Sequence, residues 1–433
     1  MPSDALPKGP WWELFHDSTL SDLETNALAG SQTLRAAVAR VDQARATARA
    51  ARSQFFPQLS LDPSYEHQQT SGHLPTPIPF RIPQAQYDSF SVPLDLSYEV
   101  DLWGRVRRGF ESARASAQAS AADYQSVLLT MTSDLAIDYF LVSSLDGEIA
   151  ALRETAAARG DSARLLRAQF KTGAIAELDA VQAETALASA QADLADALRQ
   201  RAETLHALAL LCGRSATAFS LPEQPLRGPP PEVPGDLPAN VLERRPDVAS
   251  AERTLASRNA QIGVARAAYF PAISLTGQGG YLSASADELF TGDSRVWSIG
   301  PSVSLPLFTG GRTKAQVGQA RASYTEGVAN YRQAILTAVK EVEDSLMQIQ
   351  SRKEQAAAVD RAVDSARRQM ELAKARYSAG ASTYLPVADA ERTLRQEQVQ
   401  QAQLRGERYA ASVRLIKALG GGWGTNAQYS SNH

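Results

Sequence analysis

The segment Ala168-Gln-Phe-Lys-Thr-Gly173 recurs as Ala375-Arg-Tyr-Ser-Ala-Gly380, 207 residues further along the chain. Two further pairs keep the same spacing: Gly104-Arg105 with Gly311-Arg312, and Cys212-Gly213 with Leu419-Gly420. A constant spacing over so long a stretch indicates two gap-free copies of one helical unit, longer than the common solenoid repeats. The sequence therefore predicts a tandem duplication.

A second repeated motif precedes each long unit. Arg52-Ser-Gln-Phe-Phe-Pro57 matches Arg266-Ala-Ala-Tyr-Phe-Pro271 at a spacing of 214 residues, so the first copy holds seven additional residues, which we expect in the Pro-rich loop 73–83. A helix is expected to end at each motif, at about Leu20 to Gln54 and Asp247 to Tyr269, because proline disfavours helix in the residue before it.

Two strand-like runs follow each motif. Phe90 to Val100 carries apolar residues at every even position, and Trp297 to Leu307 alternates equally strictly. Their expected partners, about 58–68 and 272–282, are less regular. Strands of about ten residues with one apolar face suit a tilted membrane β-barrel. An ordinary antiparallel sheet packed on helices is the alternative that alternation alone leaves open.

The alternation predicts two faces for these strands. The face expected to meet lipid or the adjoining apolar belt comprises Phe90, Val92, Leu94, Leu96, Ile299, Val303 and Leu305. The face expected to line a water-filled lumen comprises Ser91, Ser97, Ser302 and Ser304. Four strands cannot close a barrel, and open edges in hydrocarbon leave backbone groups unpaired at a cost of several kcal/mol each, so a membrane barrel must be shared between chains.

Long helical hairpins are expected after each strand pair. Each would hold a stretch of roughly fifty residues, a break at Phe170 to Gly173 or Tyr377 to Gly380, and a second helix. A coiled-coil seam is predicted from leucines spaced 7, 4, 7 and 3 residues apart: Leu187, Leu194, Leu198, Leu205 and Leu208. Prolines between the copies predict a semi-rigid extended linker that ends near Val241.

The composition excludes several classes of protein. Of the 433 residues, 44% are hydrophobic and only 7% aromatic, and 44 Lys+Arg against 47 Asp+Glu give no basic excess for nucleic acid. The single cysteine, Cys212, lies in an apolar run and is expected to be buried. The five histidines are scattered and no Gly-rich phosphate loop is present, so we expect no enzyme, no metal site and no cofactor.

A set of motifs, taken in their order along the chain, resembles the TolC-like outer membrane factor family, specifically its NodT/OprM-like branch of RND efflux outer membrane lipoproteins. The motifs are Leu242-Glu-Arg-Arg-Pro-Asp247, Ile262 to Thr276, Pro306-Leu-Phe-Thr-Gly-Gly-Arg312, Glu341-Val-Glu-Asp344, Ala375 to Gly380 and Leu419-Gly-Gly-Gly-Trp423. The resemblance covers nearly the whole chain.

The resemblance implies a mostly α-helical chain with membrane β-strands, in a homotrimer. Its twelve-stranded β-barrel takes four strands from each chain and continues into the periplasm as a long α-helical barrel. The implied function is the exit duct of a tripartite efflux pump, which passively conducts drugs or other small molecules across the outer membrane. The implied partners are a periplasmic adaptor protein, an inner-membrane RND-type transporter and outer membrane lipid. A lipid anchor is also implied, although no cysteine precedes Trp11.

The resemblance also assigns two functional regions. The turns of the hairpins are the adaptor-docking tips, with Gly173, Ala174, Leu178, Gly380, Ala381, Ser382, Tyr384 and Leu385. Asp389 is carried over as the gate, where three-fold symmetry would gather three carboxylates around one axis. The family sequence there is Leu-Asp-Val-Leu-Asp-Ala, whereas this chain has Pro386 at the first aspartate. No catalytic residue is implied.

Two alternative functions stay open at this level: a type I protein-secretion duct, and a soluble coiled-coil scaffold, which explains the helices and the repeat but not the alternating strands. The expected segments are an N-terminal segment with the first-copy helix (1–54), a first β-hairpin (55–102), a first helical hairpin (103–213), a Pro-rich linker (214–240), a second-copy helix (241–268), a second β-hairpin (269–309), a second helical hairpin (310–420) and a tail (421–433).

Overall fold

The computed structural model describes residues 9–71, 84–232 and 244–421. The chain forms two compact units, the first from residues 1–39, 122–249 and 333–433 and the second from residues 40–121 and 250–332. The loop expected at 73–83, the start of the second copy near Val241 and residues 422–433 of the tail lie outside the described residues.

The bounds of the helices confirm the duplication. Helices α2 (Gln32–Ser53) and α6 (Pro246–Ala267) differ by 214 residues at both ends. Helices α3 (Arg105–Lys171) and α7 (Arg312–Ser378) differ by 207 residues at both ends, and each has 67 residues rather than the fifty expected. The spacing of the sequence motifs is therefore also the spacing of the folded elements.

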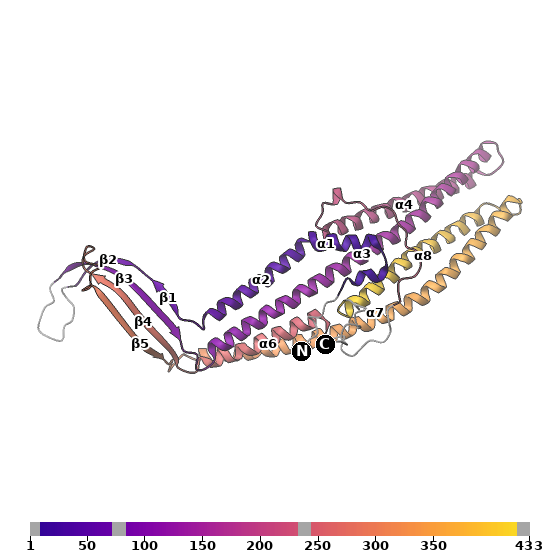
Figure 1. Cartoon of the computed structure of the whole chain (residues 1–433). Coiled ribbons are helices and arrows are strands. Elements are labelled where there is room, and N and C mark those ends of the chain that lie inside the picture. The colour runs from indigo at the N-terminus through magenta and orange to yellow at the C-terminus, as the bar shows by residue number, and fades with distance from the viewer. Residues whose placement is uncertain (1–8, 72–83, 233–243, 422–433) are drawn as a thin grey trace, which may run out of the picture. The chain divides into compact units, whose positions relative to one another are not determined.

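The second unit contains one antiparallel sheet in the order β1-β3-β4-β5, with β2 also paired to β3 (Figure 1). Its strands are β1 (Gln58–Leu61), β2 (Ser64–Gln69), β3 (Gln86–Glu99), β4 (Ala272–Ser283) and β5 (Arg295–Ser304). The single strand expected at 58–68 is interrupted at Asp62–Pro63, because proline has no N–H to donate to the ladder. The register against β3 is the same on both sides of the interruption.

The first helix differs from the expected single helix, because α1 (Ser18–Gly30) ends before α2 begins. A Cβ added to Gly30 would lie 2.4 Å from the carbonyl oxygen of Cys212, so only glycine permits this close approach. Ser31 then begins the next helix, since its Oγ accepts a hydrogen bond from Leu34 N at 3.3 Å. A contact distant in sequence therefore fixes this break.

The first unit contains two helical hairpins, α3 with α4 (Glu177–Leu211) and α7 with α8 (Leu385–Ala418) (Figure 1). Four of the five leucines predicted as a seam on α4 pack in hydrophobic clusters: Leu208 is fully buried, and Leu187, Leu194 and Leu205 pack against buried residues. Leu198 is the exception, at 40% exposed. A second row of buried positions, spaced seven apart, was not predicted: Ala183, Ala190 and Ala197. Small side chains let neighbouring helices approach closely, and the leucines pack beside these alanines.

A hydrophobic core in the first unit joins the hairpins to the N-terminal elements. It gathers Trp11 from the 3₁₀ helix η1 (Trp11–Phe15), Leu20 from α1, Phe140 from α3 and Ile416 from α8. Cys212 is buried in this core, as expected. In the described part of the linker, only the short helix η2 (Ala216–Ala218) is regular.

A buried arginine explains two of the family-like motifs. Arg245 is 6% exposed and donates to Asp247 Oδ2 and to Glu341 Oε2, each at 2.7 Å. Its Nη1 also donates to Ala418 O, at the end of α8, at 2.9 Å. The Arg-Arg-Pro-Asp and Glu-Val-Glu-Asp motifs therefore meet at one ion cluster, which ties α6, α7 and α8 together.

No helix within residues 9–71, 84–232 and 244–421 is long and apolar enough to cross a lipid bilayer.

Glu24 of α1 is a titratable group in the core of the first unit that has no hydrogen-bond partner among the described residues. Its side chain is fully buried, and neither carboxylate oxygen has a hydrogen-bond partner. Burial raises the pKa of Glu24 to about 9. The folded state therefore favours the neutral carboxyl, whereas the unfolded chain ionises near its ordinary pKa.

We expect Glu24→Gln to raise the melting temperature at pH 8 and to leave it unchanged at pH 4. Because the folded pKa is raised, the native protein loses stability as the pH rises from about 4.5 toward 9, and the amide removes this loss. Thermal unfolding followed by circular dichroism across this range measures the effect. Glu13→Gln, at an exposed position of η1, is the control. A melting-temperature difference that does not vary with pH would contradict the prediction.

Candidate functional site

The register of the sheet places apolar and polar side chains on opposite faces. Leu96, Gly277 and Ile299 are paired directly across β3, β4 and β5, so they point to one face. The neighbouring pair, Asp95 and Gln278, points to the other face, where Gln278 Nε2 donates to Asp95 Oδ1 at 2.9 Å. The sheet therefore has an apolar face and a polar face.

The two predicted sets separate onto these faces. The apolar face carries Phe90, Val92, Leu94, Leu96, Ile299 and Val303, and the polar face carries Ser91, Ser97, Ser302 and Ser304. Leu305 follows the last residue of β5 and lies outside the register. Contact of the faces with lipid and lumen stays a prediction.

The apolar face is open in the single chain. Leu94 is 48% exposed, and Ile299 and Val303 are each 65% exposed. Contiguous exposed apolar surface of this kind marks contact with a partner or with lipid.

The charged residues on the polar face are all acidic within β1–β5. They are Glu66, Asp95 and Glu99, whereas the basic residues of the strands, His67 and Arg295, lie on the apolar face. Glu99 Oε1 accepts a hydrogen bond from Arg105 Nε at 2.7 Å. Asp95 has no ion pair within the described residues, so the polar face keeps a negative potential.

Two edges of the sheet are unpaired within the described residues. Strands β1 and β2 pair only with β3, and β5 pairs only with β4. The outward N–H and C=O groups of these edges require partners wherever water is absent. In hydrocarbon the sheet would therefore need strands from other chains.

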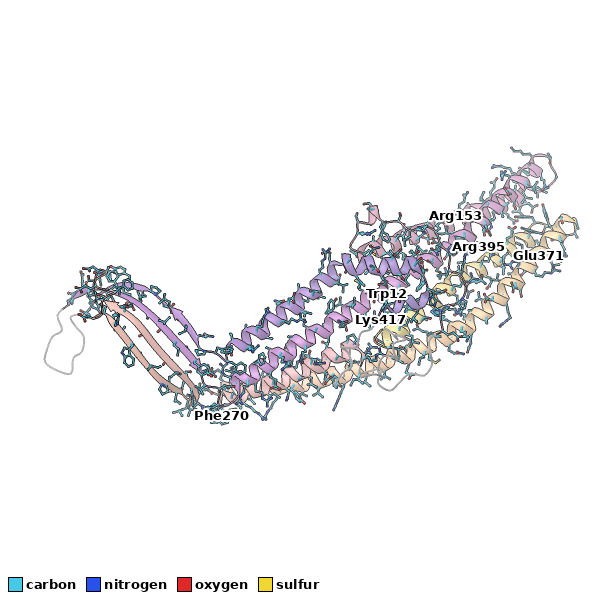
Figure 2. The ribbon with its side chains drawn as sticks, viewed as in Figure 1. Trp12, Arg153, Phe270, Glu371, Arg395 and Lys417 are labelled. Carbon is cyan, nitrogen blue, oxygen red and sulfur yellow. The ribbon has the colours of Figure 1, made fainter. Side chains whose placement is uncertain are left out.

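An aromatic contact fixes the end of the sheet where the helices join it. Trp103 stacks on Phe270 with ring centroids 4.7 Å apart, and its Nε1 donates to Pro271 O at 2.8 Å. Figure 2 labels Phe270 where the strands meet the helices. Both rings are 47% exposed. Half-exposed aromatic rings are typical of the boundary between membrane and water.

The turns of the two hairpins in the first unit have the same backbone structure. Gly173 and Gly380 have positive φ, 77° and 68°. Gly173 N donates to Phe170 O at 2.9 Å, and Ala174 N donates to Gln169 O at 2.9 Å. The second turn repeats both bonds around Gly380, so each long helix ends in a Schellman motif.

Side chains at the turns differ in exposure. Leu178 is 65% exposed and Leu385 is 49% exposed, whereas Ala174, Ala381 and the glycines are exposed and Ser382 is half-buried. Tyr384 is only 7% exposed and packs on Leu166 and Val387. Its side chain therefore supports the turn from inside the chain.

A cavity of about 770 Å³ lies beside the second turn and includes Ser382 and Pro386 in its wall. Its other wall comes from α7, with Arg368, Leu372 and Arg376. The sequence analysis did not identify these three residues. Their spacing of four along a helix, which places them on one face, is the signal that could have identified them.

A buried charged cluster joins the hairpins near these turns. Arg159 of α3 is 5% exposed and donates to Ala186 O at 2.8 Å, and Arg395 of α8 pairs with Asp193 of α4 (Figure 2). Lys374 Nζ lies 3.2 Å from Glu391 Oε1. Burial, and then the nearby Arg395, lower the pKa of Arg159.

This cluster places a carboxylate on a helix face that is closed to solvent. Carboxylates interleaved with arginines predict a solvated face, yet Glu391 is only 8% exposed. Periodicity within one helix does not show which face meets another hairpin.

The predicted gate residue, Asp389, lies on the exposed side of α8. Its Oδ1 is 3.3 Å from Arg392 Nη2, three residues further along the helix. Pro386 lies in the first turn of α8, where a missing N–H leaves no hydrogen bond unmade. Within one chain, Asp389 is therefore available to a partner or to solvent.

Comparison with known proteins matches this architecture to one family. The family model described as "Outer membrane efflux protein" matches residues 23–214 and 237–421. The pyoverdine export outer membrane protein OpmQ of Pseudomonas aeruginosa is 36% identical, over 98% of this chain and 90% of that protein. The solvent efflux pump outer membrane protein SrpC of Pseudomonas putida is 35% identical, over 97% and 88%.

The fold is similar to solved channel structures. The CmeC outer membrane channel of Campylobacter jejuni superposes with a TM-score of 0.89 at 27% identity, covering 95% of this chain and 88% of that chain.

Proposed function

The chain belongs to the outer membrane efflux protein family. On this premise we propose a mechanism by which it acts as the outer membrane channel of a tripartite efflux pump. Three copies join edge to edge, with β1 and β2 of one copy beside β5 of the next. The observation that carries this proposal is a sheet with one exposed apolar face and two unpaired edges. Edge pairing satisfies every strand and turns the apolar faces toward lipid.

The duct conducts small organic molecules without a chemical step. The relatives named for pyoverdine export and solvent efflux support export of such molecules rather than secretion of a protein. The acidic polar face becomes the lumen wall of the barrel, where it favours cations and neutral molecules over anions. Membership of this family argues against the alternative function of a soluble coiled-coil scaffold.

Partner proteins deliver the cargo at the helical turns. A periplasmic adaptor docks on the surface formed by Ala174 and Leu178 in the first turn, and by Ala381, Ser382 and Leu385 in the second. The matching Schellman turns support this assignment, because each chain presents a similar backbone twice. An inner-membrane RND-type transporter supplies the cargo through that adaptor.

A charge on the apolar face tests the barrel. We expect Leu94→Arg to lower the free energy of unfolding by ~2–4 kcal/mol if the position is near the bilayer midplane, because it places a cation in lipid. Ser97→Arg, on the polar face of the same strand, is expected to have little effect. Urea unfolding of the protein refolded in lipid vesicles measures both variants. Equal losses of unfolding free energy in the two variants would show that the assignment of the two faces to lipid and lumen is wrong.

A charge at the turns tests adaptor docking. We expect Ala174→Arg and Ser382→Arg each to abolish efflux, because a bulky cation fills the docking surface, while the trimers stay intact on native gels. Gln400→Arg, at an exposed position further along α8, is the control and should export normally. Wild-type drug resistance in both turn variants would argue against docking there.

Asp389 is proposed as the gate, as one carboxylate per chain around the trimer axis. We expect Asp389→Ala to weaken the cation selectivity of the closed channel and its block by multivalent cations, because it removes the ring of like charges. Conductance and reversal potential in planar bilayers measure both effects. Asp364→Ala, which removes an aspartate paired with an arginine three residues away on α7, is the control. Unchanged selectivity and block would move the gate to other residues.

A further inference from the structure

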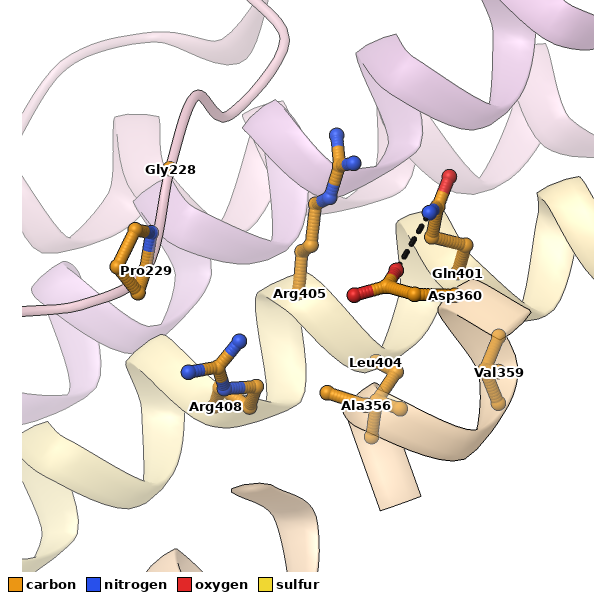
Figure 3. A pocket seen from close by; sticks show the side chains of 9 residues that line it. All are labelled: Gly228, Pro229, Ala356, Val359, Asp360, Gln401, Leu404, Arg405 and Arg408. Carbon is orange, nitrogen blue, oxygen red and sulfur yellow. Dashed lines mark hydrogen bonds between the residues drawn. The ribbon is translucent and has the colours of Figure 1, made fainter. Parts of the chain in front are cut away.

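A cavity in the first unit lies between α7, α8 and the linker segment at Gly228 and Pro229 (Figure 3). Its volume is about 350 Å³. Two neighbouring cavities share its walls: one of about 140 Å³ is also lined by Arg405, and one of about 330 Å³ is also lined by Arg408. Each of the two arginines therefore lines two of these three cavities.

Both guanidinium groups lack a partner. Within the described residues, Arg405 and Arg408 form no ion pair and no side-chain hydrogen bond, in contrast to Arg352 of α7, which lies 3.0 Å from Glu407. The two arginines are three residues apart on α8, so their side chains are neighbours on the helix surface. Each guanidinium group offers several N–H donors in a planar fork that suits a carboxylate.

The rest of the cavity is apolar except at one point. Ala356 and Val359 of α7 and Leu404 of α8 supply small and medium apolar surface. Asp360 lies at the side of the cavity away from Pro229, and its Oδ1 accepts a hydrogen bond from Gln401 Nε2 at 2.6 Å (Figure 3). A carboxylate has further acceptor sites after this bond, so it can also accept an N–H from a ligand.

The linker wall of the cavity is held in place without a ligand. Tyr409 Oη donates to Arg227 O at 3.3 Å and lies 3.4 Å from Pro229 O. On the other side of the linker, Gln224 N donates to Asp146 Oδ2 at 2.8 Å. The site is therefore preformed, which lowers the entropy that a ligand must lose on binding.

We propose that this cavity binds the C-terminal carboxylate of a peptide with small apolar side chains. The carboxylate pairs with Arg405 and Arg408, the side chains lie on Val359 and Leu404, and a backbone N–H donates to Asp360. Two other occupants are possible outcomes of the test. An inorganic anion would bind only to the arginines, and a second copy of this chain would contact the arginines as part of the assembly.

The test uses the full-length protein in detergent, purified as it assembles, with acetyl-alanyl-alanine as the probe. Isothermal titration calorimetry compares the free acid with its C-terminal amide, and inorganic phosphate at the same ionic strength separates general anion binding from peptide binding. The variants are Arg405→Gln with Arg408→Gln, Asp360→Asn, and Arg367→Gln as the control. Arg367 has Asp364 as its partner and does not line the cavity.

We expect the free acid to bind, and the amide and the double arginine variant each to bind about tenfold more weakly or worse, because charge-assisted hydrogen bonds are lost. Asp360→Asn should weaken the peptide but not phosphate, and Arg367→Gln should bind as the wild type does. No binding of the free acid, equal binding of the amide, equally strong binding of phosphate, or dissociation of the assembly in the double variant would each overturn the proposal. Conductance in planar bilayers is read in parallel, so a failed peptide site is distinguished from a failed channel.

Discussion

Backbone hydrogen bonding at the edges of one sheet is the constraint on which the rest of this protein depends. The sheet has a face suited to lipid, but among the strands that the structure describes, β1, β2 and β5 each leave one side unpaired. In hydrocarbon, unpaired edge groups cost several kcal/mol each, so this sheet is compatible with a membrane only when other strands complete it. Assembly into a closed barrel and contact with lipid are therefore one requirement. Each chain already pairs β1 and β2 with β3, β3 with β4, and β4 with β5, so only the pairing to the next chain is missing.

The duplication also explains a close backbone contact at the C-terminal end of each returning helix, α4 and α8. A Cβ added to Gly213 would lie 2.2 Å from Gly30 O, and a Cβ added to Gly420 would lie 3.0 Å from Arg244 O. Both glycines have positive φ, and they occupy equivalent places in the two copies. In each copy the returning helix thus ends by packing its backbone against the segment that begins the copy, a contact that larger residues would prevent.

The sequence predicts whatever depends on local order and repetition. The spacing of Gly173 and Gly380 predicts the helical turns, and the alternation around Leu94 predicts both faces of the sheet. The sequence contains Pro63, but it does not predict that the first strand is interrupted there, because proline is also tolerated in edge strands. The alanine seam at Ala190 and the burial of Arg159 depend on which face of a helix meets another hairpin, and that choice is made by contacts far apart in the sequence.

The turns of the two copies have equal backbones but unequal side chains. Glu177 of the first turn corresponds to the buried Tyr384 of the second, and Gln182 corresponds to Asp389. The Schellman bonds tolerate these changes because they use only backbone atoms and a glycine. A trimer of this chain would therefore present six turns of one shape but two chemistries. Only the second set carries a carboxylate at this position, so a gate built on Asp389 would depend on α8 and not on its counterpart α4.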